Sequence, residues 1–202
     1  MIDNKFRMWL APNSNKIISF YRWIGITPNK VTFLSLVLSF CAAYTCFLGL
    51  NLITILLWWI GRFFDGTDGI LARETNQATS FGAYLDILCD MASYSVIIIG
   101  FFYRFSLFSH LWVIIFFLYI LCITSALSLG HLQEKLLLNI NDNRGLKLGV
   151  GLIEGGETGV AYSLFLLFPG HLKIMLYIWI LLLLITILAR TFFAYRVLNL
   201  KS

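Results

Sequence analysis

The sequence predicts an all-α integral membrane protein, in which six membrane-spanning helices follow an N-terminal amphipathic helix at the membrane interface. Two observations support this class. Of the 202 residues, 59% are hydrophobic and 12% are charged, whereas soluble domains carry about 25% charged residues. The apolar residues also gather in runs of about 20, the length that an α-helix needs to cross a bilayer. Such a chain cannot cover its surface with polar side chains, so we expect most of that surface to face lipid.

Residues 1–30 are predicted to form the interfacial helix and a turn. Apolar side chains recur here at helical spacing, with Lys16 and Arg22 on the opposite face, a pattern typical of a helix that lies in the interface plane. Pro28 ends this helix, because it has no N–H for the hydrogen-bond ladder and disfavours helix at Thr27. The apolar face consists of Ile17, Phe20, Tyr21 and Ile24.

Residues 31–202 are predicted to form a single bundle of six spans, each a mainly apolar run long enough to cross the hydrocarbon core. The first run, Val31–Leu50, contains no charged residue. The second run starts at Asn51, is apolar through Ile60, and becomes polar at its far end. The other four are predicted from Gly82 to beyond Phe102, and at Leu111–Leu129, Leu148–Phe168 and Ile174–Tyr195.

Lysine and arginine predict the orientation of these spans, because cytoplasmic loops carry an excess of both. One side has only Arg104 and Lys173. We therefore expect a multi-pass protein of the inner (cytoplasmic) membrane, with both termini and the acidic ends of the second and third spans in the cytoplasm. The net charge of +5 then reflects contact with anionic membrane lipids, and no basic stretch interleaved with aromatic residues indicates a nucleic-acid partner. The predicted cytoplasmic side has Lys5, Arg7, Lys16, Arg22, Lys30, Arg73, Lys135, Arg144, Lys147, Arg196 and Lys201.

Four aspartates form the candidate reactive cluster. Asp65 and Asp68 are three residues apart, and Asp86 and Asp90 are four apart, so each pair shares one face of its helix. The short connection between the two helices predicts antiparallel neighbours whose four carboxylates converge at one depth. Unpaired carboxylates are untenable beside lipid, and ionisable residues there are functional by default. All-oxygen ligands suit hard divalent cations, so we expect two Mg²⁺ (or Mn²⁺) ions at this cluster.

The residues around the aspartates indicate a phosphate-bearing ligand. Two-metal carboxylate sites stabilise both the attacking and the leaving oxygen in phosphoryl transfer. Gly69, Ala72 and Gly82 leave room for a flat or bulky ligand between the helices, although small residues also serve close helix packing. Arg62 and Arg73 could neutralise part of the acidic charge.

Read as one string, these positions resemble the signature of the CDP-alcohol phosphotransferase family, with all eight motif positions matched. The turn Thr27-Pro28-Asn29 followed by Thr32 also resembles the family's approach to its first spanning helix. The architecture that this resemblance implies, an interfacial helix and six spans, covers the whole chain. The matching string is Asp65-x-x-Asp68-Gly69-x-x-Ala72-Arg73, eight residues, then Gly82-x-x-x-Asp86-x-x-x-Asp90.

The resemblance implies a reaction and a set of roles. Family members move the phosphate-linked alcohol of a CDP-alcohol to an acceptor hydroxyl and release CMP, generally as homodimers. By this resemblance Asp65, Asp68 and Asp86 would be metal ligands. Asp90 would ligate the second metal and act as general base on the acceptor hydroxyl. The nucleotide and its diphosphate would contact Gly69, Ala72, Arg73 and Gly82, with Asn29 of the first turn counted among them.

The substrates are less closely defined by the sequence. An all-membrane enzyme with its cluster at the interface favours a lipid donor, CDP-diacylglycerol, over other CDP-alcohols, together with a small polar alcohol as acceptor. Basic side chains would suit a phosphorylated acceptor, whereas glutamates would suit a cationic or neutral polyol. These residues could equally pair with one another or with lipid headgroups. The candidate acceptor residues are Arg190, Arg144, Lys147, Glu154 and Glu157.

Two other functions are compatible with acidic residues in a membrane protein. A transporter could use buried carboxylates as an ion relay, but it would not explain Gly69, Ala72 and Arg73 at fixed spacing, and the chain has no internal repeat. An intramembrane prenyltransferase also binds Mg-diphosphate through two aspartate-rich stretches. In that family the two stretches lie on well-separated helix pairs, whereas here both lie within residues 65–90.

Overall fold

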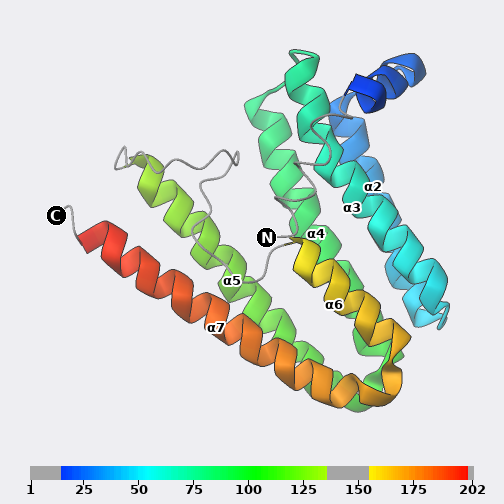
Figure 1. The fold of residues 1–202 in the computed structure, drawn as a ribbon, viewed down its shortest axis with the longest axis vertical. Coiled ribbons are helices and arrows are strands. Elements are labelled where there is room, and N and C mark those ends of the chain that lie inside the picture. The colour runs from blue at the N-terminus through cyan, green and yellow to red at the C-terminus, as the bar shows by residue number, and fades with distance from the viewer. Residues whose placement is uncertain (1–14, 136–154, 200–202) are drawn as a thin grey trace.

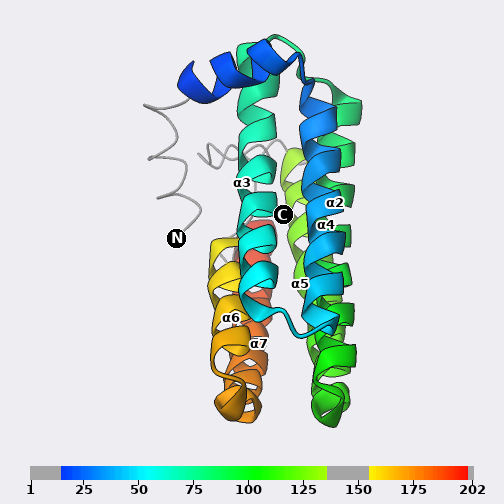
Figure 2. The same ribbon diagram turned by 90° about the vertical axis from the view of Figure 1, so that its right-hand side faces the viewer.

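The computed structural model describes residues 15–135 and 155–199, and in these ranges the chain is all-α. A first helix covers residues 15–24 and lies across one end of the bundle (Figures 1 and 2). The predicted all-α class is thereby confirmed. The following helices are α2 (Pro28–Phe47), α3 (Asn51–Glu74), α4 (Ser80–Arg104), α5 (Ser109–Lys135), α6 (Gly155–Leu167) and α7 (Leu172–Asn199), with 3₁₀ turns η1 (Ser106–Phe108) and η2 (Pro169–His171).

In the described residues, four helices that coincide with predicted spans are long and apolar enough to cross a membrane: α2, α4, α5 with η1, and α7 with η2. The remaining two are α3 and α6. Helix α3 is long enough, but its second half carries the charged residues of the predicted cluster. Helix α6 is described from Gly155 onward, and residues 148–154 of the predicted fifth span lie outside the described residues. The count of six spans therefore stays a prediction.

The helix boundaries follow from local chemistry. Thr27 is extended (φ −88°, ψ 156°) and Pro28 opens α2, as the missing N–H of proline predicts. Gly49 adopts φ +79° in the turn between α2 and α3, a conformation that glycine reaches without strain. Thr79 caps α4, because its Oγ1 accepts a hydrogen bond of 3.0 Å from the N–H of Gly82.

Helix α2 holds the acidic helices together, since it packs along both α3 and α4. Its approach to α4 is close at Gly100, where an added Cβ would lie 2.8 Å from the carbonyl oxygen of Ala43. The predicted antiparallel arrangement of α3 and α4 is present (Figure 1). The two helices are joined mainly through α2 rather than by direct packing on each other, and this leaves their facing sides available to side chains from the cluster.

A second group of helices completes the bundle. Helices α5 and α7 pack together, and in Figure 1 this pair diverges from α2–α4 toward the end at which α3 and α4 connect. An aromatic core joins the groups at the other end, where Phe101 stacks on Trp112 with centroids 4.9 Å apart. The Tyr119 hydroxyl accepts hydrogen bonds from Tyr162 (3.1 Å) and Trp179 (3.0 Å). The aromatic core thus joins the two groups of described helices at the end opposite the aspartates.

Candidate active site

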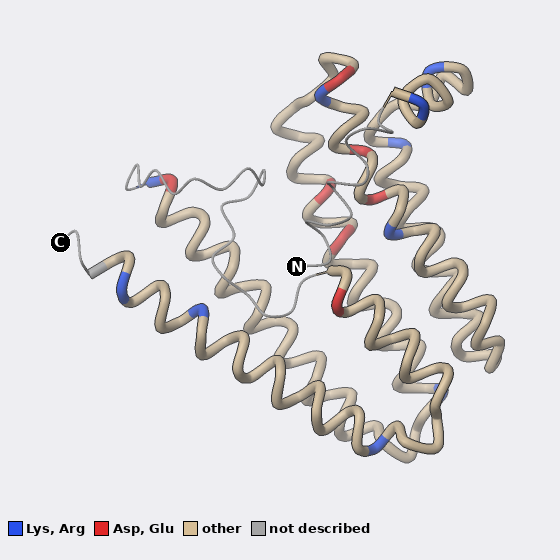
Figure 3. Tube along the Cα trace, in the orientation of Figure 1, with Lys and Arg blue, Asp and Glu red and all other residues tan. Residues whose placement is uncertain are grey.

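The charged side chains gather at one end of the bundle. Figure 3 shows the acidic residues of α3 and α4 near the end at which these helices connect, with basic residues at the same ends of the other helices. The four aspartates lie in the second half of α3 and the first half of α4. The spacing that predicted two acidic helix faces is therefore realised on two helices that run in opposite directions.

Asp68 is fixed toward α2. Its side chain is buried, and its two oxygens have separate donors: Thr32 Oγ1 of α2 donates to Oδ2, and the Gly69 N–H donates to Oδ1 at 2.5 Å. Thr32 is buried at 4% exposure. A carboxylate held by two donors is restrained in both position and rotation. Thr32 thus has a defined contact with Asp68. The sequence alone indicates Thr32 only as a residue that follows the turn Thr27-Pro28-Asn29.

Arg62 joins the two acidic helices. Its Nη1 lies 3.4 Å from Asp65 Oδ2 and forms an ion pair with Asp90 Oδ1. Its Nη2 donates to Ser35 Oγ of α2 at 3.3 Å. The expected neutralisation of the cluster by Arg62 is therefore present, whereas Arg73 is exposed at the end of α3, with its Nη1 3.5 Å from the point where a Cβ of Gly69 would stand.

The donor set fits a hard divalent cation. Asp65 Oδ1 is buried and has no hydrogen-bond partner in the described part of the chain, which leaves one carboxylate oxygen ready for a cation. The other oxygen of Asp65 and one oxygen of Asp90 contact Arg62. With Arg62 in this position, no three Asp, Glu, His or Cys side chains in residues 15–135 and 155–199 are grouped closely enough to hold a metal ion. The assignment of Asp65, Asp68, Asp86 and Asp90 as ligands stays a prediction.

The predicted nucleotide residues lie close to this cluster. A Cβ on Gly82 would stand 3.2 Å from Asn29 Oδ1 and 3.1 Å from Thr79 Oγ1, so the first turn of α2 meets the start of α4. At Gly69 the nearest neighbour of an added Cβ is Arg73, and Ala72 is half-buried one turn along α3. The structure thus brings Asn29 to Gly82, and Gly69 to Arg73, at the acidic end of the bundle.

The helix at residues 15–24 is tied to the site by a tyrosine. Tyr21 is buried, and its hydroxyl lies 2.7 Å from Thr67 Oγ1, next to Asp68 in α3. Burial raises the pKa of Tyr21 above its ordinary value, so the hydroxyl keeps its proton at neutral pH. Sequence reasoning had placed Tyr21 on the apolar face without this bond. Thr67 is the sequence feature that could have indicated a partner for Tyr21, because it places a hydroxyl directly before the second aspartate of the motif.

The predicted acceptor residues divide into two groups. Arg144, Lys147 and Glu154 lie outside the described residues. Glu157 is in the first turn of α6. Arg190 is 7% exposed, and its Nη1 donates to the Cys122 carbonyl oxygen (2.5 Å) and to Ser125 Oγ (3.1 Å), both on α5. Arg190 is therefore buried against α5, as expected of a charge that avoids lipid, and its predicted contact with the acceptor stays a prediction.

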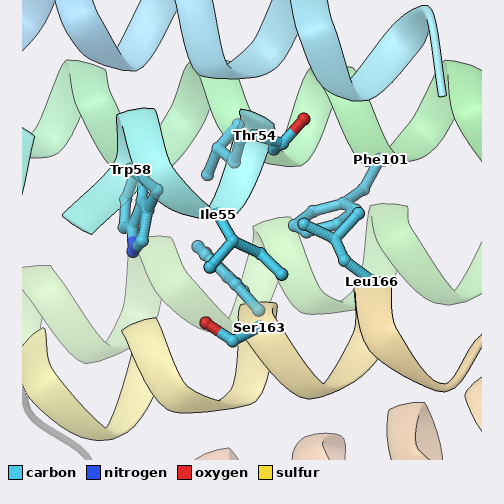
Figure 4. A pocket seen from close by; sticks show the side chains of 8 residues that line it. Thr54, Ile55, Trp58, Phe101, Ser163 and Leu166 are labelled. Carbon is cyan, nitrogen blue, oxygen red and sulfur yellow. The ribbon is translucent and has the colours of Figure 1, made fainter. Parts of the chain in front are cut away.

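A small pocket lies between residues of α3, α4 and α6, and none of the four aspartates lines it (Figure 4). It is too small to hold a ligand, and its walls are mainly apolar side chains together with the hydroxyl-bearing side chains of Thr54, Tyr162 and Ser163. Such a lining offers nothing to bind a phosphate or a metal. Its lining residues are Thr54, Ile55, Trp58, Ile97, Phe101, Tyr162, Ser163 and Leu166.

Comparison with known protein families decides the class of this site. The sequence pattern of one family, described as CDP-alcohol phosphatidyltransferase, matches residues 25–198, which is most of the chain and includes all eight motif positions. The chain belongs to this family. The resemblance inferred from the aspartate motif is thereby confirmed. The transporter and prenyltransferase alternatives find no support in these comparisons.

Individual relatives are similar over shorter stretches. The archaetidylinositol phosphate synthase of Pyrococcus horikoshii is 34% identical over 77 residues, which are 38% of this chain and 41% of that protein. The phosphatidylinositol phosphate synthase of Mycobacterium tuberculosis is 37% identical over 78 residues, 38% of this chain and 36% of that protein. The chain thus spans about two fifths of the length of the curated relatives it matches.

Solved structures share the fold over nearly the whole chain. The M. tuberculosis phosphatidylinositol phosphate synthase with CDP-DAG bound has a TM-score of 0.68 at 21% identity, covering 92% of this chain and 94% of that one. The same protein in complex with manganese and citrate has a TM-score of 0.66 at 21% identity, covering 90% of this chain and 88% of that one. These structures establish a common helical membrane fold.

Proposed function

We propose that this protein transfers a phosphatidyl group from a CDP-alcohol, in the first place CDP-diacylglycerol, to the hydroxyl of a small polar alcohol, with release of CMP. The observation that carries the proposal is the convergence of Asp65, Asp68 and Asp90 on one end of the bundle within the family motif. The relatives named as phosphatidylinositol phosphate synthases support the same reaction class. The protein would then be an enzyme of phospholipid synthesis.

Divalent metal ions belong to this proposal. Asp65, Asp68, Asp86 and Asp90 would hold two Mg²⁺ or Mn²⁺ ions, since carboxylates and substrate phosphates are the ligands that these ions prefer. When bound, the ions supply charge neutralisation at the diphosphate and stabilise the leaving CMP oxygen. The buried, unpartnered Oδ1 of Asp65 supports a cation at this position. A relative crystallised with manganese supports the choice of ion.

The residues around the aspartates would bind the donor. The missing side chains of Gly69 and Gly82 would let the cytosine and ribose approach the helix backbone, and at Gly82 an added Cβ would already crowd Thr79 Oγ1 and Asn29 Oδ1. Arg73 would extend its guanidinium to the diphosphate. The small side chain of Ala72 would leave room for the ligand on the adjoining turn of α3. Asn29, which lies beside Gly82, would offer its side-chain amide to the nucleotide.

Asp90 would be the general base. It accepts the proton of the acceptor hydroxyl as the acceptor oxygen forms a bond to the phosphorus that carries the lipid alcohol. The bond between this phosphorus and the oxygen that bridges to CMP breaks, and CMP leaves with that oxygen and its electron pair. Arg62 contacts one oxygen of Asp90, which leaves the other oxygen for the proton.

The acceptor is proposed to be a small polar alcohol that carries a phosphate. The buried position of Arg190 supports this choice, because a guanidinium inside the bundle can bind phosphate through two parallel hydrogen bonds. The names of the relatives, which form phosphatidylinositol phosphate or archaetidylinositol phosphate, support it as well. Arg144 and Lys147 would assist, and Glu154 and Glu157 would hold hydroxyl groups of the acceptor.

The placement in the membrane is also a proposal. We infer six spans, an interfacial helix at residues 15–24 and an inner (cytoplasmic) membrane location, with both termini and the active site facing the cytoplasm. The gathering of basic residues at the acidic end of the bundle (Figure 3) supports this orientation. A homodimer is expected from the family resemblance.

Release of CMP tests the proposed function. The purified protein would be supplied with Mg²⁺, CDP-diacylglycerol and one acceptor at a time: inositol phosphate, glycerol phosphate, inositol and serine. We expect CMP release that depends on the acceptor and is fastest with a phosphorylated polyol, and no release when EDTA replaces Mg²⁺. Acceptor-independent or EDTA-insensitive release would contradict the proposal.

A further inference from the structure

Arg62 is a deeply enclosed cation in contact with the aspartate cluster. Its side chain is 9% exposed, and its guanidinium touches three helices. Nη2 donates to Ser35 Oγ of α2, while Nη1 contacts Asp65 of α3 and Asp90 of α4. Helices α3 and α4 are held together mainly by α2. The Arg62 guanidinium adds a direct link between their acidic faces.

Aromatic rings fix the position of this guanidinium. Its central carbon lies 5.0 Å from the ring centroid of Trp58 and 5.1 Å from that of Tyr94, distances typical of cation–π contacts. Trp58 packs against Tyr94 at 5.6 Å and against Tyr162 of α6 at 5.2 Å. The rings therefore support Arg62 from the bundle core, independently of the carboxylates that it contacts.

A buried charge held in this way acts on its neighbours. An enclosed arginine is stable only with opposite charges close by, and the planar guanidinium can hold two carboxylates at fixed separation. Asp65 and Asp90 are thereby kept at a defined distance although they belong to different helices. The same positive charge also opposes the approach of any further cation to these carboxylates.

We propose that Arg62 is a positioning residue that fixes Asp90 relative to Asp65 and lowers the affinity of the cluster for divalent cations. The motif of the family does not include this position. The consequence for turnover rests on the proposed function, in which Asp90 is the base, whereas the consequence for metal binding does not.

The two effects have opposite signs. Arg62→Gln removes one positive charge beside the carboxylates, so we expect Mn²⁺ to bind about ten-fold more tightly. This gain corresponds to a modest share of the repulsion between two positive charges about 4 Å apart. The same change releases Asp90, so turnover should fall about ten- to hundred-fold, within the range of a mispositioned base. A purely structural role would weaken both metal binding and turnover.

Mn²⁺ titration of the purified protein, followed by the electron paramagnetic resonance signal of the free ion, provides the test. Arg62→Gln is compared with Arg62→Lys, which keeps the charge without the planar fork and should bind Mn²⁺ as the unchanged protein does while turning over more slowly. Arg62→Lys also provides the test if Arg62→Gln does not fold. The matched control is Arg196→Gln. Arg196 also makes a cation–π contact, 4.5 Å from the ring centroid of Phe192, but it is exposed on α7. The control substitution should leave both quantities unchanged.

A double-mutant cycle on Mn²⁺ affinity completes the test. If Arg62 acts through Asp90, the effect of Arg62→Gln should shrink at least three-fold in an Asp90→Asn background, because coupled residues are not additive. Weaker or unchanged Mn²⁺ binding in Arg62→Gln, or fully additive effects in the cycle, would overturn the proposal. Failure of the unchanged protein to release CMP would overturn the proposed function alone, since the Mn²⁺ measurements stand without turnover.

Discussion

Asp65, Asp68 and Asp90 have different neighbours, and these differences predict different roles. Asp68 has both oxygens engaged by Thr32 and by the Gly69 N–H, so it is the most restrained of the carboxylates whose contacts are described above. Asp65 has one oxygen near Arg62 and one buried without a partner among the described residues. Asp90 contacts Arg62 through one oxygen. Residues with such different surroundings should respond differently to the same substitution.

The substitution Asp90→Asn should separate base from ligand. We expect turnover to fall by more than about 100-fold, the upper part of the range for general-base catalysis, because the amide cannot accept the proton of the acceptor. CDP-alcohol binding should fall less than in Asp65→Asn, since three carboxylates remain. Steady-state kinetics and nucleotide binding measured on both variants check this. Equal loss of nucleotide affinity in both, with normal turnover at saturation, would make Asp90 a ligand only.

Arg190 is the residue that tests the nature of the acceptor. Arg190→Lys keeps the charge and loses the bidentate fork, so the apparent KM of a phosphorylated acceptor should rise about ten-fold with a smaller change in kcat. Kinetics with inositol phosphate as acceptor provide the measurement, with Arg196→Lys as control. If the KM is unchanged and Glu157→Gln raises it instead, the acceptor site is built on glutamates and an unphosphorylated alcohol is the better substrate.

At the scale of elements, helix α2 determines how the site is assembled. It supplies Thr32 to Asp68 and Ser35 to Arg62, and it packs along both acidic helices. Thr32 and Ser35 are three positions apart, so both hydroxyls lie on one face of the helix. An otherwise apolar helix thus carries a polar face where it meets the cluster.

The close contact of α2 with α4 gives a stability prediction. An added Cβ at Gly100 would lie 2.8 Å from the backbone oxygen of Ala43, which cannot move without shifting α2. Gly100→Ala should therefore destabilise the protein by about 1–3 kcal/mol, the usual cost of overpacking. Thermal unfolding in detergent measures this. Gly170→Ala is the control, because nothing lies within 4 Å of its added Cβ, and equal melting temperatures for the two variants would contradict the packing argument.

Much of the element pattern could be predicted from the sequence. Apolar runs located the cores of α2, α4, α5 and α7, and Pro28 located the start of α2. The observed helix boundaries differ from the predicted ones by a few residues, because a capping residue such as Thr79 starts a helix before its apolar run begins.

Parts of the site could not be read from the sequence in the same way. The aspartate motif and the partial neutralisation by Arg62 followed from spacing and charge. The contacts of Thr32 and Ser35 with the cluster did not, because α2 joins α3 and α4 through tertiary packing that no local pattern encodes. The bond between Tyr21 and Thr67 links residues 46 positions apart, and such long-range pairs leave no periodic trace in the chain.

For the whole molecule, the arrangement of charge and shape agrees with chemistry at a membrane surface. Helices α5 and α7 diverge from α2–α4 toward the acidic end (Figure 1), and the helix at residues 15–24 lies across that end with Phe20, Trp23 and Ile24 exposed. Exposed aromatic and aliphatic side chains beside basic ones suit the headgroup region. This arrangement agrees with the proposed donor, which has a charged nucleotide and a lipid tail.

Cysteine labelling tests the orientation. In a cysteine-free background, Ala78→Cys lies in the connection between α3 and α4, and Lys173→Cys lies at the opposite end, at the start of α7; both positions are exposed. A membrane-impermeant maleimide added to intact cells should label Lys173→Cys alone, and both variants after the cells are opened. Labelling of Ala78→Cys in intact cells would place the aspartates outside the cytoplasm and contradict the proposed topology.

The position of the metal and of the nucleotide tests the central claim most directly. Crystals of the protein grown with Mn²⁺ and CDP-diacylglycerol would be measured at the manganese absorption edge. The account predicts two anomalous peaks within coordination distance of Asp65, Asp68, Asp86 and Asp90, with the diphosphate against them and the cytosine beside Gly69 and Gly82. Manganese bound at any other place in the bundle, or a nucleotide away from these four carboxylates, would contradict it.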